Sequence, residues 1–286
     1  MELATLVMNY RHVFHAGNSA DVFKHAVLVL LLKALQKKEA PFCYLDTHAG
    51  AGRYDLAGAS ARRTNEAEGG IARLWGTGDL SPALGDYLEA VRTLNPSGRL
   101  RYYPGSPRLA RRFLRAQDRM ILVERAPEEF VALKKEFAAD RQVTVQQQDG
   151  YAALKAHLPP KERRGLVLLD PPYEAVDEFA QVSSGLEAAH ARWSGGVYAI
   201  WYPIKERRET QRFLQALAAS GIRKILCAEL ALYPEDNALR LNGCGMAIVN
   251  PPWQLDAALE RLLPELLERL RQVAAGRAQV RWLVPE

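Results

Sequence analysis

Gly165-Leu166-Val167-Leu168-Leu169-Asp170-Pro171-Pro172-Tyr173 is an apolar run that stops at an acid, two prolines and an aromatic ring. Its apolar residues are too few for a buried helix and are typical of a strand that is buried on both faces of a parallel sheet. Proline cannot continue such a strand, so we expect it to end at Asp170. Ligands of open α/β sheets bind just beyond the carboxyl ends of the strands. Asp170 and Tyr173 are therefore candidate site residues.

The groups of this loop suit the exocyclic amine of a nucleobase. Such an amine is a poor nucleophile because its lone pair is delocalised into the ring. The Asp170 carboxylate and the Pro171 carbonyl can each accept one of its N–H bonds, and Tyr173 offers a flat face to an unstacked base. The tetrapeptide resembles the catalytic loop of amino methyltransferases that use S-adenosylmethionine. An acid followed by two prolines also ends strands for structural reasons alone, so the motif requires support from elsewhere.

A glycine-rich turn provides the first support. A short apolar strand over 42–45 is followed by Gly50 and Gly52, which let the backbone approach a ligand closely. The third glycine of the dinucleotide fingerprint is missing, which argues against a nicotinamide enzyme.

Two further strand ends carry acids in the order that such a methyltransferase needs. The strand over 120–123 leads to Glu124, which suits ribose hydroxyls, and the strand over 143–145 leads to Asp149 and Gly150, where an acid can accept from the amine of the cofactor's adenine. Singly, each acid is more often an ordinary strand-end or helix-cap residue. Four motifs in the right chain order are much harder to obtain by accident.

The alternation of strands and helices predicts an α/β protein. We expect a Rossmann-like S-adenosylmethionine-dependent methyltransferase fold, with a mostly parallel, doubly wound seven-stranded sheet, an antiparallel hairpin at its edge and a final short strand over 280–284. Residues 54–100 contain no convincing strand and predict an inserted helical subdomain. The methyltransferase domain then comprises 1–53 and 101–286, and Ser106 is expected to cap a helix that opens toward the cofactor.

A second loop of similar composition, Asn250-Pro251-Pro252-Trp253, follows a later strand. Its first residue is an amide rather than an acid. The catalytic strand must also neighbour the first strand at the switch point of the sheet, which the fourth strand does and the seventh does not. We therefore assign the chemistry to Asp170.

Long identities then make a family resemblance specific. The chain resembles the RlmJ family of bacterial 23S ribosomal RNA adenine-N6-methyltransferases, which modify adenine 2030. The resemblance covers nearly the whole sequence, and it rests on Met8-Asn9-Tyr10-Arg11-His12, Phe14-His15-Ala16-Gly17-Asn18, Asp21-Val22, Lys24-His25, residues 44–54, residues 101–107, Asp-Pro-Pro-Tyr, residues 199–203 and Asn250-Pro251-Pro252-Trp253.

The resemblance implies roles for individual residues. Asp170 matches the proton acceptor, and Tyr10 matches a tyrosine taken to contact substrate RNA. The implied S-adenosylmethionine positions are His25, His48, Ser106, Glu124, Asp149, Gly150 and Asp170, with Lys24 beside the first of them. Residues 1–7 precede the usual start of the family, so either Met1 or Met8 is the native start.

Composition agrees with this interpretation without supplying it. The formal net charge of +5 favours an anionic partner. Five arginines lie on a helical stretch after Pro107, where a solvated helix face is as good an explanation as RNA contact; they are Arg108, Arg111, Arg112, Arg115 and Arg119. We expect the partner to be free or partly assembled 23S ribosomal RNA, and the protein to be a cytoplasmic monomer without a membrane segment.

Other features have ordinary explanations. The three cysteines are far apart and are read as reduced core residues. The histidines lack a Cys or acid at ligand spacing, so no metal is expected. Judged by its helix alone, which we expect over 20–35, His25 would be a surface residue.

Two alternatives stay open at this stage. A DNA adenine methyltransferase shares the Asp-Pro-Pro-Tyr loop, although no segment here is large enough for a separate target-recognition domain. A catalytically idle RNA-binding protein could retain the fold, but it would not need intact cofactor and catalytic motifs.

Overall fold

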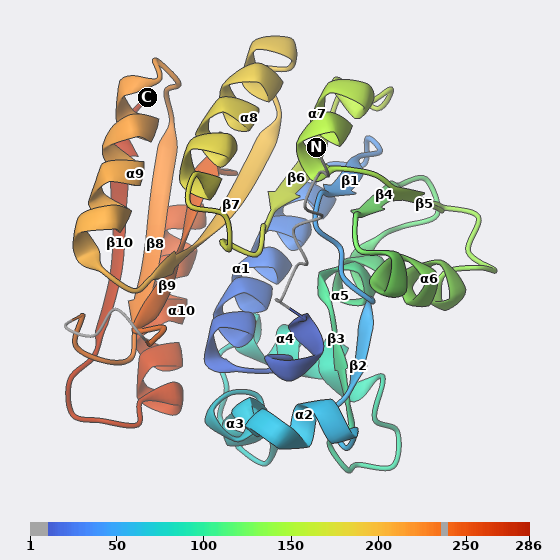
Figure 1. The fold of residues 1–286 in the computed structure, drawn as a ribbon, viewed down its shortest axis with the longest axis vertical. Helices are drawn as coiled ribbons and strands as arrows, with labels where there is room; N and C mark the ends of the chain where they lie inside the picture. Colours follow the sequence, from blue (N-terminus) through green and yellow to red (C-terminus); the bar gives the residue numbers. More distant parts are fainter. Residues whose placement is uncertain (1–10, 236–239) are drawn as a thin grey trace, which may run out of the picture.

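An eight-stranded sheet runs through the molecule in the order β10-β8-β9-β7-β6-β1-β4-β5 (Figure 1). The structure is a computed structural model that describes residues 11–235 and 240–286. Five neighbouring strands are parallel, whereas β9 and β10 run antiparallel to their neighbours. The strands are β1 (Cys43–Asp46), β4 (Arg119–Glu124), β5 (Val143–Gln147), β6 (Gly165–Leu169), β7 (Val197–Ile204), β8 (Ile225–Ala231), β9 (Gly243–Val249) and β10 (Arg277–Val284).

Helices cover both faces of this sheet, because alternate side chains of each buried strand point to opposite faces. In β6, Leu166 and Leu168 join one core and Val167 and Leu169 the other. The predicted Rossmann-like, mostly parallel α/β fold is confirmed. The C-terminal strand is longer than the predicted 280–284, however, because β10 covers Arg277–Val284, and it makes the sheet eight-stranded rather than seven-stranded. The first core contains α1 (Ser19–Gln36), α4 (Pro82–Arg92), α5 (Ser106–Phe113), α6 (Pro127–Glu136) and α10 (Leu255–Leu270), and the second α7 (Gly150–His157), α8 (Glu178–Arg192) and α9 (Arg207–Ala219).

Helix α1 is buried on nearly all sides. It packs against α4, α5 and α10 as well as the sheet, which explains why its sequence is apolar all round rather than along one stripe. Asn18 begins the helix by accepting a hydrogen bond from the Asp21 N–H at 2.9 Å. The interpretation of His25 as a surface residue is wrong for this reason, since its side chain is fully buried.

The segment 54–100 contributes α2 (Ala59–Thr64), a 3-10 turn η2 (Glu66–Gly69), α3 (Ala72–Trp75) and α4. Its apolar side chains belong to the same core cluster as α1. The expectation of no strand is wrong at its start, because β2 (Arg53–Asp55) pairs antiparallel with β3 (Tyr102–Pro104). Tyr54 lies opposite Tyr103 in this ribbon, and both are buried.

The strand order decides which loops meet. β1 lies between β6 and β4, so the loops after these three parallel strands open on one edge of the sheet. Because β9 is antiparallel to β7, Asn250 lies at the opposite edge, where its side-chain amide donates to the carbonyls of Ser194 and Gly196. The structure thus separates the Asn-Pro-Pro-Trp loop from the edge that carries Asp170.

Gly245 provides a test of the second core. A Cβ at this position in β9 would overlap the fully buried ring of Tyr202 on β7. We expect Gly245→Ala to lower the free energy of unfolding by about 1–3 kcal/mol, because the ring has no room to move. The control is Gly85→Ala in α4, where nothing lies within 4 Å; it should be stabilising by about 0.5–1 kcal/mol. Chemical denaturation measures both, and equal effects would contradict the packing argument.

Candidate active site

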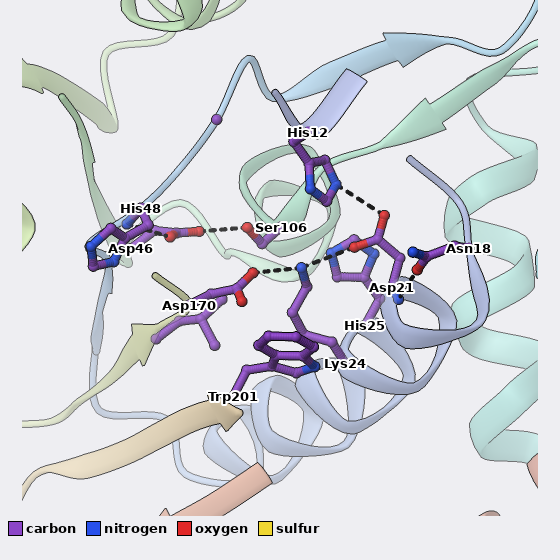
Figure 2. Close-up of polar contacts among 12 residues, drawn as sticks. His12, Asn18, Asp21, Lys24, His25, Asp46, His48, Ser106, Asp170 and Trp201 are labelled. Atoms are coloured by element: carbon purple, nitrogen blue, oxygen red, sulfur yellow. Dashed lines mark hydrogen bonds and ion pairs between the residues drawn. The ribbon is translucent and has the colours of Figure 1, made fainter. Parts of the chain in front are cut away.

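Asp170 lies at the carboxyl end of β6, where its carboxylate pairs with a lysine from α1. The Lys24 ammonium donates to Asp170 Oδ2 at 2.6 Å (Figure 2). Lys24 is 5% exposed and the Asp170 side chain is 16% exposed, so this is a partly buried ion pair between residues that are 146 positions apart in the chain. Among the described residues, no donor to the other oxygen of Asp170 is recorded. That oxygen is available to accept a further hydrogen bond.

A second carboxylate, Asp21, holds the same ammonium from the preceding turn of α1. Lys24 Nζ lies 2.9 Å from Asp21 Oδ1, while Asp21 Oδ2 lies 3.0 Å from His12 Nε2 in the 3-10 turn η1 (His12–Phe14). Burial alone would raise the pKa of Asp21, but the charges of His12 and Lys24 hold it well below its usual value. Asp170, Lys24, Asp21 and His12 form a continuous chain in Figure 2.

The glycine turn after β1 is fastened to the end of β4. Glu124, the last residue of β4, accepts from the Gly50 N–H at 2.8 Å and from the Ala126 N–H at 2.7 Å. Gly50 has φ +59°, and a Cβ there would overlap the Tyr54 hydroxyl. Both the turn and the close approach therefore require glycine at this position. Glu124 is buried, which raises its pKa; its Oε2 binds the glycine turn and its Oε1 binds the backbone just after β4.

Asp46 ends β1 and was assigned no role from the sequence. Its Oδ2 accepts from the Ser106 hydroxyl at 2.7 Å and the Tyr44 hydroxyl at 2.8 Å, as Figure 2 shows for Ser106. Burial raises the pKa of Asp46 to about 6, although both hydroxyl donors lower it. The signal that could have identified Asp46 was its position, since it is the acid that ends the strand neighbouring β6.

The predicted capping role of Ser106 is wrong. Gly105 is the N-cap of α5, and Ser106 is the first helical residue. Its hydroxyl points to Asp46 instead of the backbone, because an acid at the end of β1 offers the stronger acceptor. Ser106 nevertheless lies at the same sheet edge as the other predicted residues.

Asp149, Gly150 and His48 meet beside the glycine turn. Asp149 caps α7, with one oxygen accepting from the N–H groups of Tyr151 and Ala152. A Cβ at Gly150 would lie 2.5 Å from the Thr47 carbonyl and 2.8 Å from the His48 ring, so only glycine fits. Burial lowers the pKa of His48 to about 4 and keeps the imidazole neutral.

His25 on α1 is fully buried beside Tyr103 of β3. Its Nδ1 is 2.8 Å from the Tyr103 hydroxyl, which also contacts the Tyr87 hydroxyl at 2.9 Å. Its buried Nε2 has no hydrogen-bond partner among the described residues. Burial lowers the pKa of His25 to about 3, so the ring is neutral. An unpaired ring nitrogen can serve a ligand or a water molecule.

Tyr173 is held in a fixed orientation. It has φ +51°, its hydroxyl donates to the Trp201 carbonyl at 2.6 Å, and its ring is tilted against Phe179 at 4.8 Å. Pro171 beside it is buried. A half-buried ring in the loop after β6 is suited to supporting a flat ligand. Tyr10, the other aromatic candidate, lies outside the described residues.

The arginines after Pro107 are mostly paired with acids. Arg115 lies 2.9 Å from Asp118 and Arg119 lies 2.8 Å from Glu162, while Arg108 pairs with Glu136 and Arg111 with Asp140. Their positive charge is therefore largely balanced locally. By contrast, Arg62 and Arg63 on α2 are exposed and make no ion pair within the part of the chain that the structure describes.

Known proteins match this chain along most of its length. The sequence model of the family described as ribosomal RNA large subunit methyltransferase D, RlmJ, matches residues 39–284. The chain belongs to the RlmJ family. The Escherichia coli K12 protein named Ribosomal RNA large subunit methyltransferase J is 46% identical over 280 residues, which cover 98% of this chain and 100% of that protein. A Haemophilus influenzae protein of the same name is 45% identical over 281 residues, with coverage of 98% and 100%.

A solved structure agrees with this membership. The crystal structure of a Legionella pneumophila protein matches with a TM-score of 0.87 and 34% identity, covering 94% of this chain and 98% of that one. The family resemblance predicted from the sequence is thus confirmed. Within residues 11–235 and 240–286 there is no cluster of three or more potential metal ligands, and no helix is long and apolar enough to cross a membrane.

The titration of Asp46 tests the electrostatics of this site. We expect a midpoint of about 6 by carboxyl ¹³C NMR, and a higher one in Ser106→Ala, because the lost hydroxyl donor lowers the pKa of the wild type. The pKa in the folded state lies above the ordinary value of 3.8. This group therefore stabilises the fold more as the pH falls from about 6 to 4, by on the order of 3 kcal/mol, and less as it rises through 6.

The control for this titration is Ser183→Ala on α8, where the hydroxyl donates to the Phe179 carbonyl. This variant should leave the Asp46 midpoint unchanged. A wild-type midpoint below 4 would show that Asp46 is not held in a buried, acceptor-rich environment.

Proposed function

We propose that this protein transfers a methyl group from S-adenosylmethionine to N6 of a specific adenine in 23S ribosomal RNA. Membership of the RlmJ family supports methyl transfer to ribosomal RNA. The observation that carries the finer proposal is the Asp170 carboxylate, held by Lys24 at the end of β6 with one oxygen directed away from that ion pair. This is the arrangement that an aromatic amine needs from its acceptor.

The groups around the glycine turn fit the cofactor. Gly50 and Gly150 occupy positions that no side chain can share, and acids from three neighbouring strand ends surround them. Glu124 is suited to ribose hydroxyls and Asp149 to the adenine amine of the cofactor, while Asp46 offers a carboxylate to its positively charged end. The other residues that we propose to line the cofactor site are Lys24, His25, His48, Gly52, Ser106 and Asp170.

When bound, S-adenosylmethionine supplies a methyl group on a positively charged sulfur. The chain's own contribution is to hold the amine. The free oxygen of Asp170 and the Pro171 carbonyl accept the two N–H bonds of the adenine amine, so its lone pair points away from both. Asp170 then takes the proton that the nitrogen loses. Tyr173 supports the ring of the unstacked base, and its fixed orientation reduces the entropy lost on binding.

We expect Asp170→Asn to lower the rate constant of methyl transfer by more than about 1000-fold, because an amide cannot take a proton. Affinity for S-adenosylmethionine, measured by calorimetric titration, should change only slightly. The matched control is Asp177→Asn seven residues later, whose exposed carboxylate accepts from Gln181 and does not reach the site. Retained turnover in Asp170→Asn would contradict the assignment of this carboxylate.

The substrate is tested with 23S ribosomal RNA that lacks N6-methyladenine. We expect one nucleotide to be modified, and mass spectrometric mapping should find N6-methyladenosine at the position equivalent to adenine 2030. Parallel reactions with assembling large-subunit particles and with adenine-containing duplex DNA separate the remaining alternatives. Transfer to DNA in preference to RNA would overturn the proposal, and binding of S-adenosylmethionine without transfer to any substrate would favour the idle RNA-binding protein.

A further inference from the structure

The proposed chemistry assigns no role to Asp21, although this carboxylate is at the centre of the hydrogen-bond chain in Figure 2. Asp21 is 3% exposed. Its Oδ1 lies 2.9 Å from the Lys24 ammonium, and its Oδ2 lies 3.0 Å from His12 Nε2 and accepts from the Gly17 N–H at 2.9 Å. A carboxylate that only helped to begin helix α1 would not need contacts with both a buried ammonium and a histidine.

We propose that Asp21 is a positioning residue for methyl transfer, which holds the Lys24 ammonium against one oxygen of Asp170 and leaves the other oxygen for the substrate amine. The inference rests on the proposed function, because it assumes that Asp170 accepts from that amine. Asp21 itself does not touch the substrate; it acts through Lys24.

Geometry is the first argument. A lysine side chain has four rotatable bonds, so a single partner would leave the ammonium free to move between the two oxygens of Asp170. Asp21 is three residues before Lys24, a spacing that brings the two side chains together on one face of α1. The ammonium is thereby fixed between two carboxylates that come from different elements, α1 and the loop after β6.

Charge is the second argument. One ammonium cannot fully neutralise two carboxylates, so Asp170 keeps more of its acceptor strength than it would in an exclusive pair with Lys24. Because Asp21 also contacts His12, this arrangement of charges includes η1, the turn that precedes α1. The other titratable groups that interact with Asp21 are His15 and Glu66 near η1, His25 on the same helix, Cys244 on β9, and the Tyr54, Tyr87 and Tyr103 hydroxyls.

A purely structural role for Asp21 can be separated from positioning because the two use different oxygens. The backbone N–H of Gly17 is bound by Oδ2, as in a reciprocal helix cap, whereas Lys24 is bound by Oδ1. In Asp21→Asn, the amide oxygen can keep the bond to Gly17. The amide NH₂ then replaces the oxygen that accepted from Lys24, and one donor faces another.

The test compares Asp21→Asn with a matched control, Glu66→Gln. Glu66 also binds a histidine near η1, with His15 at 2.8 Å, and accepts from the Asn18 side chain at 2.9 Å, but it does not contact Lys24. We measure the single-turnover rate constant of methyl transfer at saturating S-adenosylmethionine and 23S ribosomal RNA, the dissociation constants of both, and the melting temperature.

In Asp21→Asn the rate constant should fall about 100-fold, the effect of misplacing a reacting group by roughly 1 Å, while both dissociation constants stay within about threefold. In Glu66→Gln all of these quantities should stay close to wild type. An unchanged rate constant in Asp21→Asn would overturn the inference. So would an equal loss in both variants, or a loss that is accounted for by weaker binding or by unfolded protein.

A spectroscopic measurement keeps the inference testable without the reaction. The ¹⁵N signal of a buried, doubly paired Lys24 ammonium should be protected from exchange in the wild type and in Glu66→Gln, and it should be lost or shifted in Asp21→Asn. An identical signal in all three proteins would overturn the positioning role. If wild-type protein transfers no methyl group while this signal behaves as expected, the proposed function has failed and the contact between Asp21 and Lys24 has not.

Discussion

The ion pair between the buried Lys24 and the partly buried Asp170 is the interaction around which the candidate site is arranged. Burial of an ammonium is costly, and two carboxylates offset that cost here. The pair forms because α1 lies deep in the molecule, with α4, α5 and α10 around it, and so carries Lys24 to the carboxyl edge of the sheet. The helix therefore contributes to the candidate site as well as to the core.

Two neighbouring carboxylates at this edge have different environments. Asp46 receives two hydroxyl donors and lies in a buried position that raises its pKa to about 6, whereas Asp170 receives an ammonium. Unequal environments of paired acids allow one site to assign different tasks to similar groups. A carboxylate held by a cation is suited to accept from the substrate, and one held by neutral hydroxyls is suited to a ligand that carries its own positive charge.

The sequence alone predicted those parts of the site that lie at the end of a single strand and follow from its local pattern. The apolar run of β6, the acid at the end of β4 and the acid before α7 all reach the expected edge, because parallel strands present their carboxyl ends together. Contacts between distant segments could not be predicted in this way. No local pattern indicates that Lys24 reaches Asp170, that Ser106 turns to Asp46, or that Tyr54 forms a ribbon with Tyr103.

The net charge of the sequence also does not predict which parts of the surface are positive. The formal net charge of +5 counts every arginine equally. Most of the arginines from Arg108 to Arg119, however, form ion pairs with nearby acids. Pairs of this kind contribute little field at a distance, since each cation is balanced within a few ångströms. The exposed arginines of α2 are not balanced in this way, and α2 packs against η1, the turn that carries His12. The positive field that an RNA backbone would meet therefore depends on where the acids lie, and the exposed arginines of α2 are one place where no ion pair within the described residues balances the charge.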